Sequence, residues 1–217
     1  MILNIYKPKG ITSFGVVKKI RKIVGEKKVG HGGTLDPFAE GVLIIGTGSN
    51  TKDLKKITDT NKTYTTSIKL GKTTNTLDPE GDVIEKKKIP RLNESKINKV
   101  LESFLGSSMQ TPPMFSAKKI GGVKLYELAR KNIIVDRSPT QINISDINLI
   151  NFNKNNIVFT VSCSKWTYIR VLGKEIAEKL GTVGHLNSLI RTRVGEHLIN
   201  DSVPLDKFKL SWKSYTH

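Results

Sequence analysis

The amino-acid sequence predicts an α+β fold, with a mainly antiparallel mixed sheet flanked by helices. Two segments alternate apolar and polar residues as half-buried strands do, and three others repeat apolar residues at helical spacing. These segments do not follow the regular strand–helix–strand order of a parallel doubly wound sheet, which favours the antiparallel class. A chain of 217 residues can bury its own core, and we expect a single domain over residues 1–217.

Three helices are predicted, each ending close to a glycine, the residue that most easily takes the left-handed conformation after a helix. Thr12 or Ser13 can cap the first one, because either side chain can accept a hydrogen bond from the first turn. Apolar residues recur along all three, so each has one face to bury. The predicted helices cover residues 14–24, 95–105 and 169–180.

Three strands are predicted, at residues 42–45, 64–70 and 157–163. The first is a continuous apolar run, typical of a buried strand, and a glycine-rich stretch before it, residues 25–41, predicts a loop. The last strand runs directly into the segment SKWTYIR and the third helix. The loop at residues 25–41 is therefore directly followed by a buried strand, and the segment SKWTYIR directly follows another strand.

The composition is strongly basic, with 36 Lys and Arg residues against 19 Asp and Glu and a formal charge of +17. Such a charge attracts a polyanion and makes its binding depend steeply on salt. Nucleic acid is the partner that this charge favours, although a high charge can also serve solubility alone.

Several classes of protein are disfavoured. The single cysteine, Cys163, excludes an internal disulfide and any site built on a pair of cysteines. The N-terminus is too polar for a signal peptide and no run is long enough to span a bilayer, so we expect a cytoplasmic protein without a membrane partner. The four histidines have no i, i+4 pair and no nucleotide-binding glycine motif occurs, so we expect no metal and no cofactor.

Two carboxylates compete as the reactive group, because Thr-Leu-Asp-Pro occurs at residues 34–37 and again at 76–79. Either copy can be an ordinary turn, since Asp before Pro favours one. Asp36 follows glycines that allow close approach of other backbone and precedes an apolar strand, whereas Asp78 lies in the polar stretch LDPEGD. We therefore favour Asp36 modestly and expect Asp78 to lie in a surface turn.

Five segments in order resemble TruB-type tRNA pseudouridine-55 synthases over nearly the whole chain. They are NIYKPKGITSF, GHGGTLDPFAEGVL, KTYTTSIKLGKTTNTLDPEGD, TPPMFSAKKIGGVKLYELAR and CSKWTYIRVLGKEIAEKLGTVGHLNSLIRT. The resemblance implies the pseudouridine synthase catalytic fold. It also implies an enzyme that isomerises uridine to pseudouridine at position 55, in the T-loop of tRNA, without a cofactor or an energy source.

The resemblance assigns Asp36 as the nucleophile and Arg170 as the arginine that pairs with it. The family's proposed routes have the carboxylate attack C6 of the ring, attack C1′ of the ribose, or abstract a ribose proton, and the sequence does not choose among them. Each route needs an ionised carboxylate shielded from water, which a neighbouring cation favours. The fixed guanidinium of an arginine suits a buried partner.

The resemblance also implies a pocket for a base taken out of its stack, because the target uracil is held inside the folded tRNA elbow. Tyr64 matches the tyrosine that stacks on this base, and Tyr168 and Leu189 match further pocket residues. His31, between two glycines, matches the histidine that enters the gap left in the T-loop. Candidate phosphate contacts are Lys7, Lys9, Lys18, Lys19, Lys118 and Lys119.

Three departures from the family pattern carry expectations of their own. Trp166 replaces the glycine of CSKGTYIR, so the ring either turns outward or reshapes the pocket, with strain if a left-handed backbone is needed. Ile190 replaces the first arginine of LRRT, leaving Arg191. The chain ends 25 residues after Thr192, too few for the C-terminal RNA-binding domain of the PUA type that many bacterial members carry. We expect the many lysines to compensate, so that activity falls steeply with added salt.

Two other functions compete with this interpretation. The first is an RNA-binding module that has lost catalysis, against which the intact set Asp36, Tyr64, Tyr168 and Arg170 speaks. The second is a glycosidase acting on free nucleosides, which would use two spaced carboxylates. We expect a monomer whose partner is the T-arm of tRNA, with no obligate protein partner. We also expect Asp36→Asn to abolish product and Asp78→Asn to have little effect.

Overall fold

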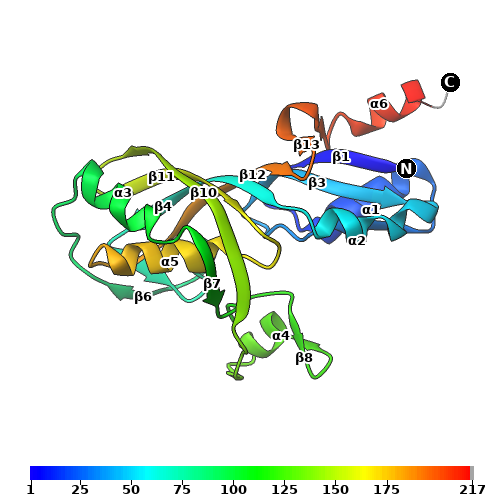
Figure 1. Ribbon diagram of the computed structural model, residues 1–217. Helices are drawn as coiled ribbons and strands as arrows, with labels where there is room; N and C mark the ends of the chain where they lie inside the picture. Colours follow the sequence, from blue (N-terminus) through cyan, green and yellow to red (C-terminus); the bar gives the residue numbers. More distant parts are fainter. Residues whose placement is uncertain (216–217) are drawn as a thin grey trace. The chain divides into compact units, whose positions relative to one another are not determined.

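The computed structural model describes residues 1–215, and the chain divides into two compact units. The first unit comprises residues 1–65 and 189–217, and the second comprises residues 66–188. Two strands, β4 (Lys62–Leu70) and β12 (Gly184–Val194), have residues in both. Helices and strands mix along the chain, and both antiparallel and parallel strand pairs occur, so the predicted α+β class with a mixed sheet is confirmed (Figure 1).

The first unit is organised around strand β3 (Glu40–Thr47), which contains the predicted buried strand. β3 pairs antiparallel with β1 (Ile2–Lys7) and β2 (Val29–Gly32), and parallel with β12. Two short strands extend the pairing, β14 (Val203–Pro204) along β1 and β13 (His197–Leu198) along β12. The helical segments of this unit are α1 (Ser13–Val24), η1 (Gly48–Lys52), α2 (Leu54–Thr58), η2 (Ile199–Asp201) and α6 (Phe208–Tyr215).

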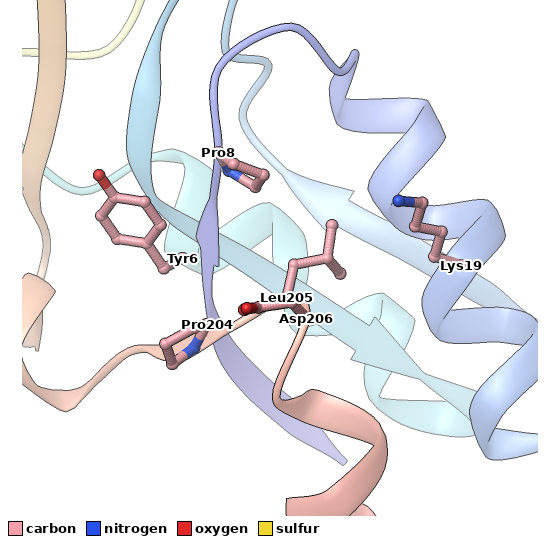
Figure 2. Close-up of a pocket in the computed structure, with 6 residues that line it drawn as sticks. All are labelled: Tyr6, Pro8, Lys19, Pro204, Leu205 and Asp206. Carbon is pink, nitrogen blue, oxygen red and sulfur yellow. The ribbon is translucent and has the colours of Figure 1, made fainter.

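A hollow of about 530 Å³ lies beside β1, and Figure 2 shows side chains from β1, α1, β14 and the residues that follow β1 and β14 around it. The Tyr6 hydroxyl donates a hydrogen bond to Glu40 Oε2 at 2.8 Å. Burial, followed by this bond and the negative charge of Glu40, raises the pKa of Tyr6 to about 12. The lining residues are Tyr6, Pro8, Lys19, Pro204, Leu205 and Asp206.

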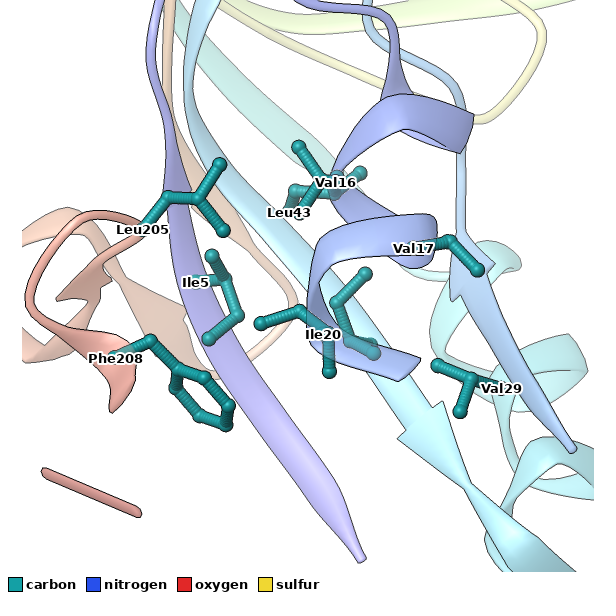
Figure 3. Close-up of a cluster of buried hydrophobic side chains, with 9 residues drawn as sticks. Ile5, Val16, Val17, Ile20, Val29, Leu43, Leu205 and Phe208 are labelled. Carbon is teal, nitrogen blue, oxygen red and sulfur yellow. The ribbon is translucent and has the colours of Figure 1, made fainter. Parts of the chain in front are cut away.

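The main core of the first unit lies between α1 and the strands β1 and β3 (Figure 3). Thr12 caps α1 by accepting a hydrogen bond from the Gly15 N–H, and Gly25 ends the helix with φ +71°. Because side chains alternate along a strand, β3 also buries Val42 and Ile44 on its other face, in a second cluster with Leu54 of α2. The main cluster contains Ile5, Val16, Val17, Ile20, Val29, Leu43, Ile45, Leu205 and Phe208.

The second unit contains the strand order β4–β11–β10–β7. Strand β10 (Thr140–Phe152) pairs antiparallel with β11 (Asn156–Cys163) on one side and with β7 (Gly106–Gln110) on the other. Two small hairpins accompany this sheet, β5 (Lys72–Thr74) with β6 (Val83–Lys86) and β8 (Lys119–Ile120) with β9 (Val123–Lys124). The helices are α3 (Glu94–Glu102), α4 (Leu125–Ala129) and α5 (Ile169–Lys179).

Close packing fixes α5 in the second unit. A Cβ atom added to Gly173 would lie 2.6 Å from the side chain of Leu186, and one added to Gly184 would lie 2.8 Å from Ala177. Side chains larger than hydrogen at these two positions would force the helix away from the strands, because protein cores have little spare volume. The helix therefore holds its N-terminal residues, Ile169 and Arg170, in fixed positions.

The predicted helices and strands are confirmed, with two corrections. Residues 25–41, predicted as a loop, contain strand β2, whose glycines hide it from pattern analysis. The long strand β10 escaped prediction because its register shifts at two irregularities, between Ile144 and Asp146 and between Leu149 and Asn151, which interrupt the alternation. None of the helices within residues 1–215 is long and apolar enough to cross a membrane.

Candidate active site

The loop between β2 and β3 carries Asp36, in the first unit. The Asp36 carbonyl accepts a hydrogen bond from the Ala39 N–H at 3.1 Å, which closes a tight turn around Pro37. Asp36 is half-buried, and Leu35 before it and Phe38 after it are buried. Gly33 opens the loop with φ +91°, a conformation that favours glycine.

Ser13 holds the residue before Asp36 by two hydrogen bonds. Its buried hydroxyl accepts from the Leu35 N–H at 2.8 Å and donates to the Leu35 carbonyl at 3.0 Å. Both backbone groups of Leu35 are thereby satisfied by one side chain at the start of α1. The sequence gives no sign of this role, because a serine at a helix start is normally a cap, and Thr12 caps this helix.

Lys7 holds the other side of the loop and is 0% exposed. Its Nζ donates to the carbonyls of Ala39 at 2.6 Å, Pro8 at 3.0 Å and Pro37 at 3.3 Å, and the Gly10 N–H also donates to Pro37 at 2.8 Å. The prediction that Lys7 contacts RNA phosphate is wrong, because a fully buried ammonium group has no surface to offer a phosphate. Lys7 fixes the turn that follows Asp36.

Arg191, on β12, supports the loop that carries Asp36, and it is 1% exposed. Its guanidinium donates three hydrogen bonds to carbonyls: Nε to Val42 at 2.8 Å, Nη2 to Gly33 at 3.1 Å and Nη1 to Thr34 at 3.4 Å. Gly41 packs directly on the Arg191 backbone, where an added Cβ atom would lie 2.3 Å from its carbonyl oxygen. The arginine that remains in LIRT is therefore a structural support of the Asp36 loop.

His31 lies on strand β2, opposite Ile45, and not in a loop as the sequence indicates. Among residues 1–215, no hydrogen-bond partner is found for its buried Nδ1. Burial above all, and then the positive charge of Arg191, lower the pKa of His31, while a hydrogen bond with the Gly33 backbone acts in the opposite direction. The lowered pKa favours the neutral imidazole, and the position of His31 on a strand leaves its side chain less free than its flanking glycines suggest.

Two further predicted pocket residues, Tyr64 and Leu189, lie in the first unit. Tyr64 on β4 is buried, and so is Leu189 on β12. The Thr192 hydroxyl donates to the carbonyl of Thr63 at 3.2 Å, which links the same two strands. Buried side chains can form a pocket wall or a core, so their roles stay predictions.

The second copy of Thr-Leu-Asp-Pro, in the second unit, is a turn but not a surface one. Asp78 is 4% exposed, and its Oδ1 accepts hydrogen bonds from the Thr76 hydroxyl at 2.5 Å and the Glu80 N–H at 3.0 Å. Its Oδ2 lies 3.5 Å from Nη1 of Arg170. The prediction of an exposed Asp78 is wrong, because polar composition does not reveal that a buried cation lies beside it.

Arg170 is buried at the start of α5 and holds several segments of the second unit. Besides Asp78, it donates to the carbonyls of Thr76 and Phe115, each at 2.7 Å. Its predicted pairing with Asp36, which belongs to the other unit, stays a prediction. Tyr168 lies just before this helix, where its N–H donates to Gln110 Oε1 at 2.7 Å and its carbonyl accepts from Gln110 Nε2 at 3.3 Å.

The remaining candidate lysines lie on the surface or close to it. Lys9 forms an ion pair with Glu40 at 3.2 Å, and Lys18 lies over the ring of Phe14, 5.2 Å from its centre. Lys118 donates to the Thr140 hydroxyl at 3.3 Å. Lys19 lines the hollow beside β1, and Lys119 lies on β8. Such positions leave these five available for phosphate contacts, in contrast to Lys7.

The chain is similar in sequence to a known protein family and to several of its members. A family model described as "TruB family pseudouridylate synthase (N terminal domain)" matches residues 21–169. The chain is 43% identical over 209 residues to the tRNA pseudouridine synthase B of Caldanaerobacter subterraneus subsp. tengcongensis, covering 96% of this chain and 73% of that protein. It is 44% identical over 205 residues to the protein of the same name from Clostridium tetani, covering 94% and 71%.

Solved structures are similar as well. A chain in the crystal structure of a Cbf5–Nop10–Gar1 complex superposes with a TM-score of 0.77 at 26% identity. That match covers 100% of this chain and 55% of the other, so the chain spans little more than half of that neighbour. A chain in an archaeal box H/ACA sRNP Nop10–Cbf5 complex gives a TM-score of 0.71 at 25% identity.

Proposed function

Because the chain belongs to the TruB family of pseudouridylate synthases, we propose that it isomerises the uridine at position 55, in the T-loop of tRNA, to pseudouridine. Its relatives carry the name tRNA pseudouridine synthase B, which supports tRNA as the substrate. The formal charge of +17 supports a polyanionic partner. We further propose that the protein acts as a monomer in the cytoplasm and needs no obligate protein partner.

The observation that carries the proposal is the support around Asp36. Three buried side chains from separate elements, Ser13, Lys7 and Arg191, hold the backbone on either side of this one carboxylate. A reacting group must be held within a fraction of an ångström of its productive position, and a misplacement of about 1 Å can cost ~100-fold in rate. A surface turn without a function would not need such support.

The proposed reaction breaks the bond between uracil N1 and ribose C1′ and forms a bond between C5 and C1′, after which the C5 proton is lost and N1 gains a proton. Atoms balance, because substrate and product are isomers. Asp36 initiates the reaction by one of the three routes named above. Arg170 is proposed to keep the carboxylate ionised while the site is closed to water.

The remaining residues are proposed to receive the flipped base. Tyr64 stacks on it, with Tyr168 and Leu189 completing the pocket, since a flat apolar environment replaces the stacking lost inside the RNA. His31 is proposed to approach the gap left in the T-loop. A neutral imidazole, which the lowered pKa of His31 favours, can both donate and accept a hydrogen bond there.

The test compares wild-type protein, Asp36→Asn and Asp201→Asn on an unmodified tRNA transcript, with pseudouridine detected by chemical labelling because the mass does not change. Asp201 is an exposed carboxylate of the same unit and provides the matched control. We expect product from the wild type and Asp201→Asn, none from Asp36→Asn, and similar RNA affinity for all three.

Two additional substrates sharpen this test. A T-arm minihelix should be converted if the T-loop is the recognised element, and free uridine should not be. Turnover of free uridine would favour a nucleoside glycosidase. If RNA binds but no product forms at any salt concentration tested, a binding module that has lost catalysis would be favoured.

A further inference from the structure

Trp166, in the turn between β11 and α5, has a backbone conformation that tryptophan rarely adopts. Its φ is +68°, in the left-handed region that favours glycine. The ends of the turn are fixed independently of the indole. The Thr167 hydroxyl donates to the Ser164 carbonyl at 2.9 Å, and the Ser164 N–H donates to the Asn143 carbonyl at 2.8 Å. The turn thus imposes the left-handed conformation on whichever residue occupies this position, and glycine would adopt it without strain.

The indole of Trp166 does not compensate for this strain by packing, because the residue is 57% exposed. The second tryptophan, Trp212, is less exposed, and its ring lies 5.8 Å from that of Phe208. The exposed apolar ring and the left-handed backbone each lower the stability of the fold. Backbone strain of this kind persists where a function retains it. An exposed aromatic residue of this kind is a candidate contact for a partner.

The position of Trp166 indicates what that partner is. It lies in the turn that ends at Tyr168, which the proposed function places in the base pocket, and that turn is anchored to β7 through Gln110. Lys165, beside it, is exposed, and the whole chain carries a charge of +17. Exposed aromatic rings on basic surfaces bind unpaired nucleobases by stacking, whatever the identity of the base.

We propose that Trp166 is a stacking platform for an unpaired base of the RNA substrate, adjacent to the uridine that is isomerised. The inference rests on the proposed function, since it takes RNA as the substrate. The hydrogen bonds of Ser164 and Thr167 already hold the backbone of the turn before RNA arrives, so little backbone freedom is lost on binding.

The first experiment uses fluorescence in an Asp36→Asn, Trp212→Phe background, where Trp166 is the single tryptophan and the RNA is not turned over. Titration with a T-arm RNA hairpin should quench the emission to saturation, at the dissociation constant measured by filter binding. Emission that is unchanged when the protein is saturated with RNA would overturn the proposal.

The second experiment measures affinity and thermal unfolding of Trp166→Gly, Trp166→Tyr and Trp166→Leu in otherwise wild-type protein. Trp166→Gly should bind the hairpin roughly tenfold more weakly, within the range of ~5- to ~150-fold expected for one stacked base, while its unfolding temperature stays equal or rises. Trp166→Tyr should retain most of the affinity and Trp166→Leu should not, which separates stacking from apolar bulk.

Salt dependence provides the discriminating readout. Because the indole neutralises no phosphate, Trp166→Gly should shift the plot of log affinity against log salt downward without changing its slope. An affinity of Trp166→Gly within twofold of wild type would refute the stacking role while leaving the proposed function intact. Wild-type protein that neither binds nor converts the hairpin would refute both.

Discussion

Arg191→Met is the substitution that tests most directly whether the Asp36 loop depends on its buried support. The variant keeps an unbranched apolar side chain, which is shorter than arginine, and removes all three hydrogen bonds from the guanidinium. The bond to Val42, at 2.8 Å, is short and strong, whereas those to Gly33 at 3.1 Å and Thr34 at 3.4 Å are weaker.

The expected magnitude follows from these three bonds. A buried acceptor that loses its donor costs about 1–3 kcal/mol, but a carbonyl tolerates the loss better than an N–H group, and removing a buried charge returns part of its desolvation cost. We therefore expect the free energy of unfolding to fall by about 2–4 kcal/mol. Displacement of the loop should also lower kcat by about 10- to 100-fold.

Urea denaturation measures the first quantity, and pseudouridine formation at saturating tRNA measures the second. RNA affinity should not change, because a side chain that is 1% exposed makes no contact with an RNA phosphate. Arg193→Met is the matched control, since Arg193 is exposed and donates a hydrogen bond to the nearby Gly195 carbonyl. The reasoning fails if Arg191→Met unfolds within about 0.5 kcal/mol of wild type, or if Arg193→Met is equally costly.

Three other predictions concern groups whose environment the structure revealed. Asp78→Asn should lower the free energy of unfolding by about 3 kcal/mol, because it leaves Arg170 buried beside a neutral partner. Lys7→Met should reduce stability and kcat without changing how steeply RNA affinity falls with salt, because Lys7 is buried. Lowering the pH below about 6.5 should destabilise the protein through His31, whose lowered pKa means that the unfolded chain binds the proton more readily.

Each of these has its own control. Asp82→Asn removes an exposed carboxylate near the same turn and should leave the urea midpoint unchanged. Lys19→Met should flatten the salt dependence, and an equal flattening by Lys7→Met would contradict its burial. For His31, the difference in unfolding free energy between wild type and His31→Asn should shrink as the pH falls from 7.5 to 5.5. A constant difference would rule out the titration of His31 as the cause.

The sequence predicts the helices and strands of this protein better than it predicts the contacts between them. The first helix and strand β11 follow from local periodicity, because one buried face determines the spacing of apolar residues. Strand β10 does not, since its irregularities break the alternation. Asp36 was favoured by its glycines and the following strand, a local signal.

The partners of the site could not be predicted in the same way. Lys7 and Arg191 look like surface cations in a basic sequence. Only the folded chain shows that both are buried and donate hydrogen bonds to backbone carbonyls. Asp78 looks like a surface carboxylate because its counterion, Arg170, lies in a distant segment. Local patterns report the periodicity of burial, whereas a buried ion pair depends on tertiary structure.

The ribosome makes the chain from the N-terminus, so the Asp36 loop is synthesised before Arg191, whose hydrogen bonds hold it. Asp36 and the elements that carry Lys7 and Ser13 are synthesised first, whereas the guanidinium that supports Gly33 and Thr34 belongs to a residue 157 positions after Thr34. A nascent chain therefore contains Asp36, the proposed nucleophile, long before the loop that carries it is fully supported. Activity is expected to arise late, once β12 has paired with β3.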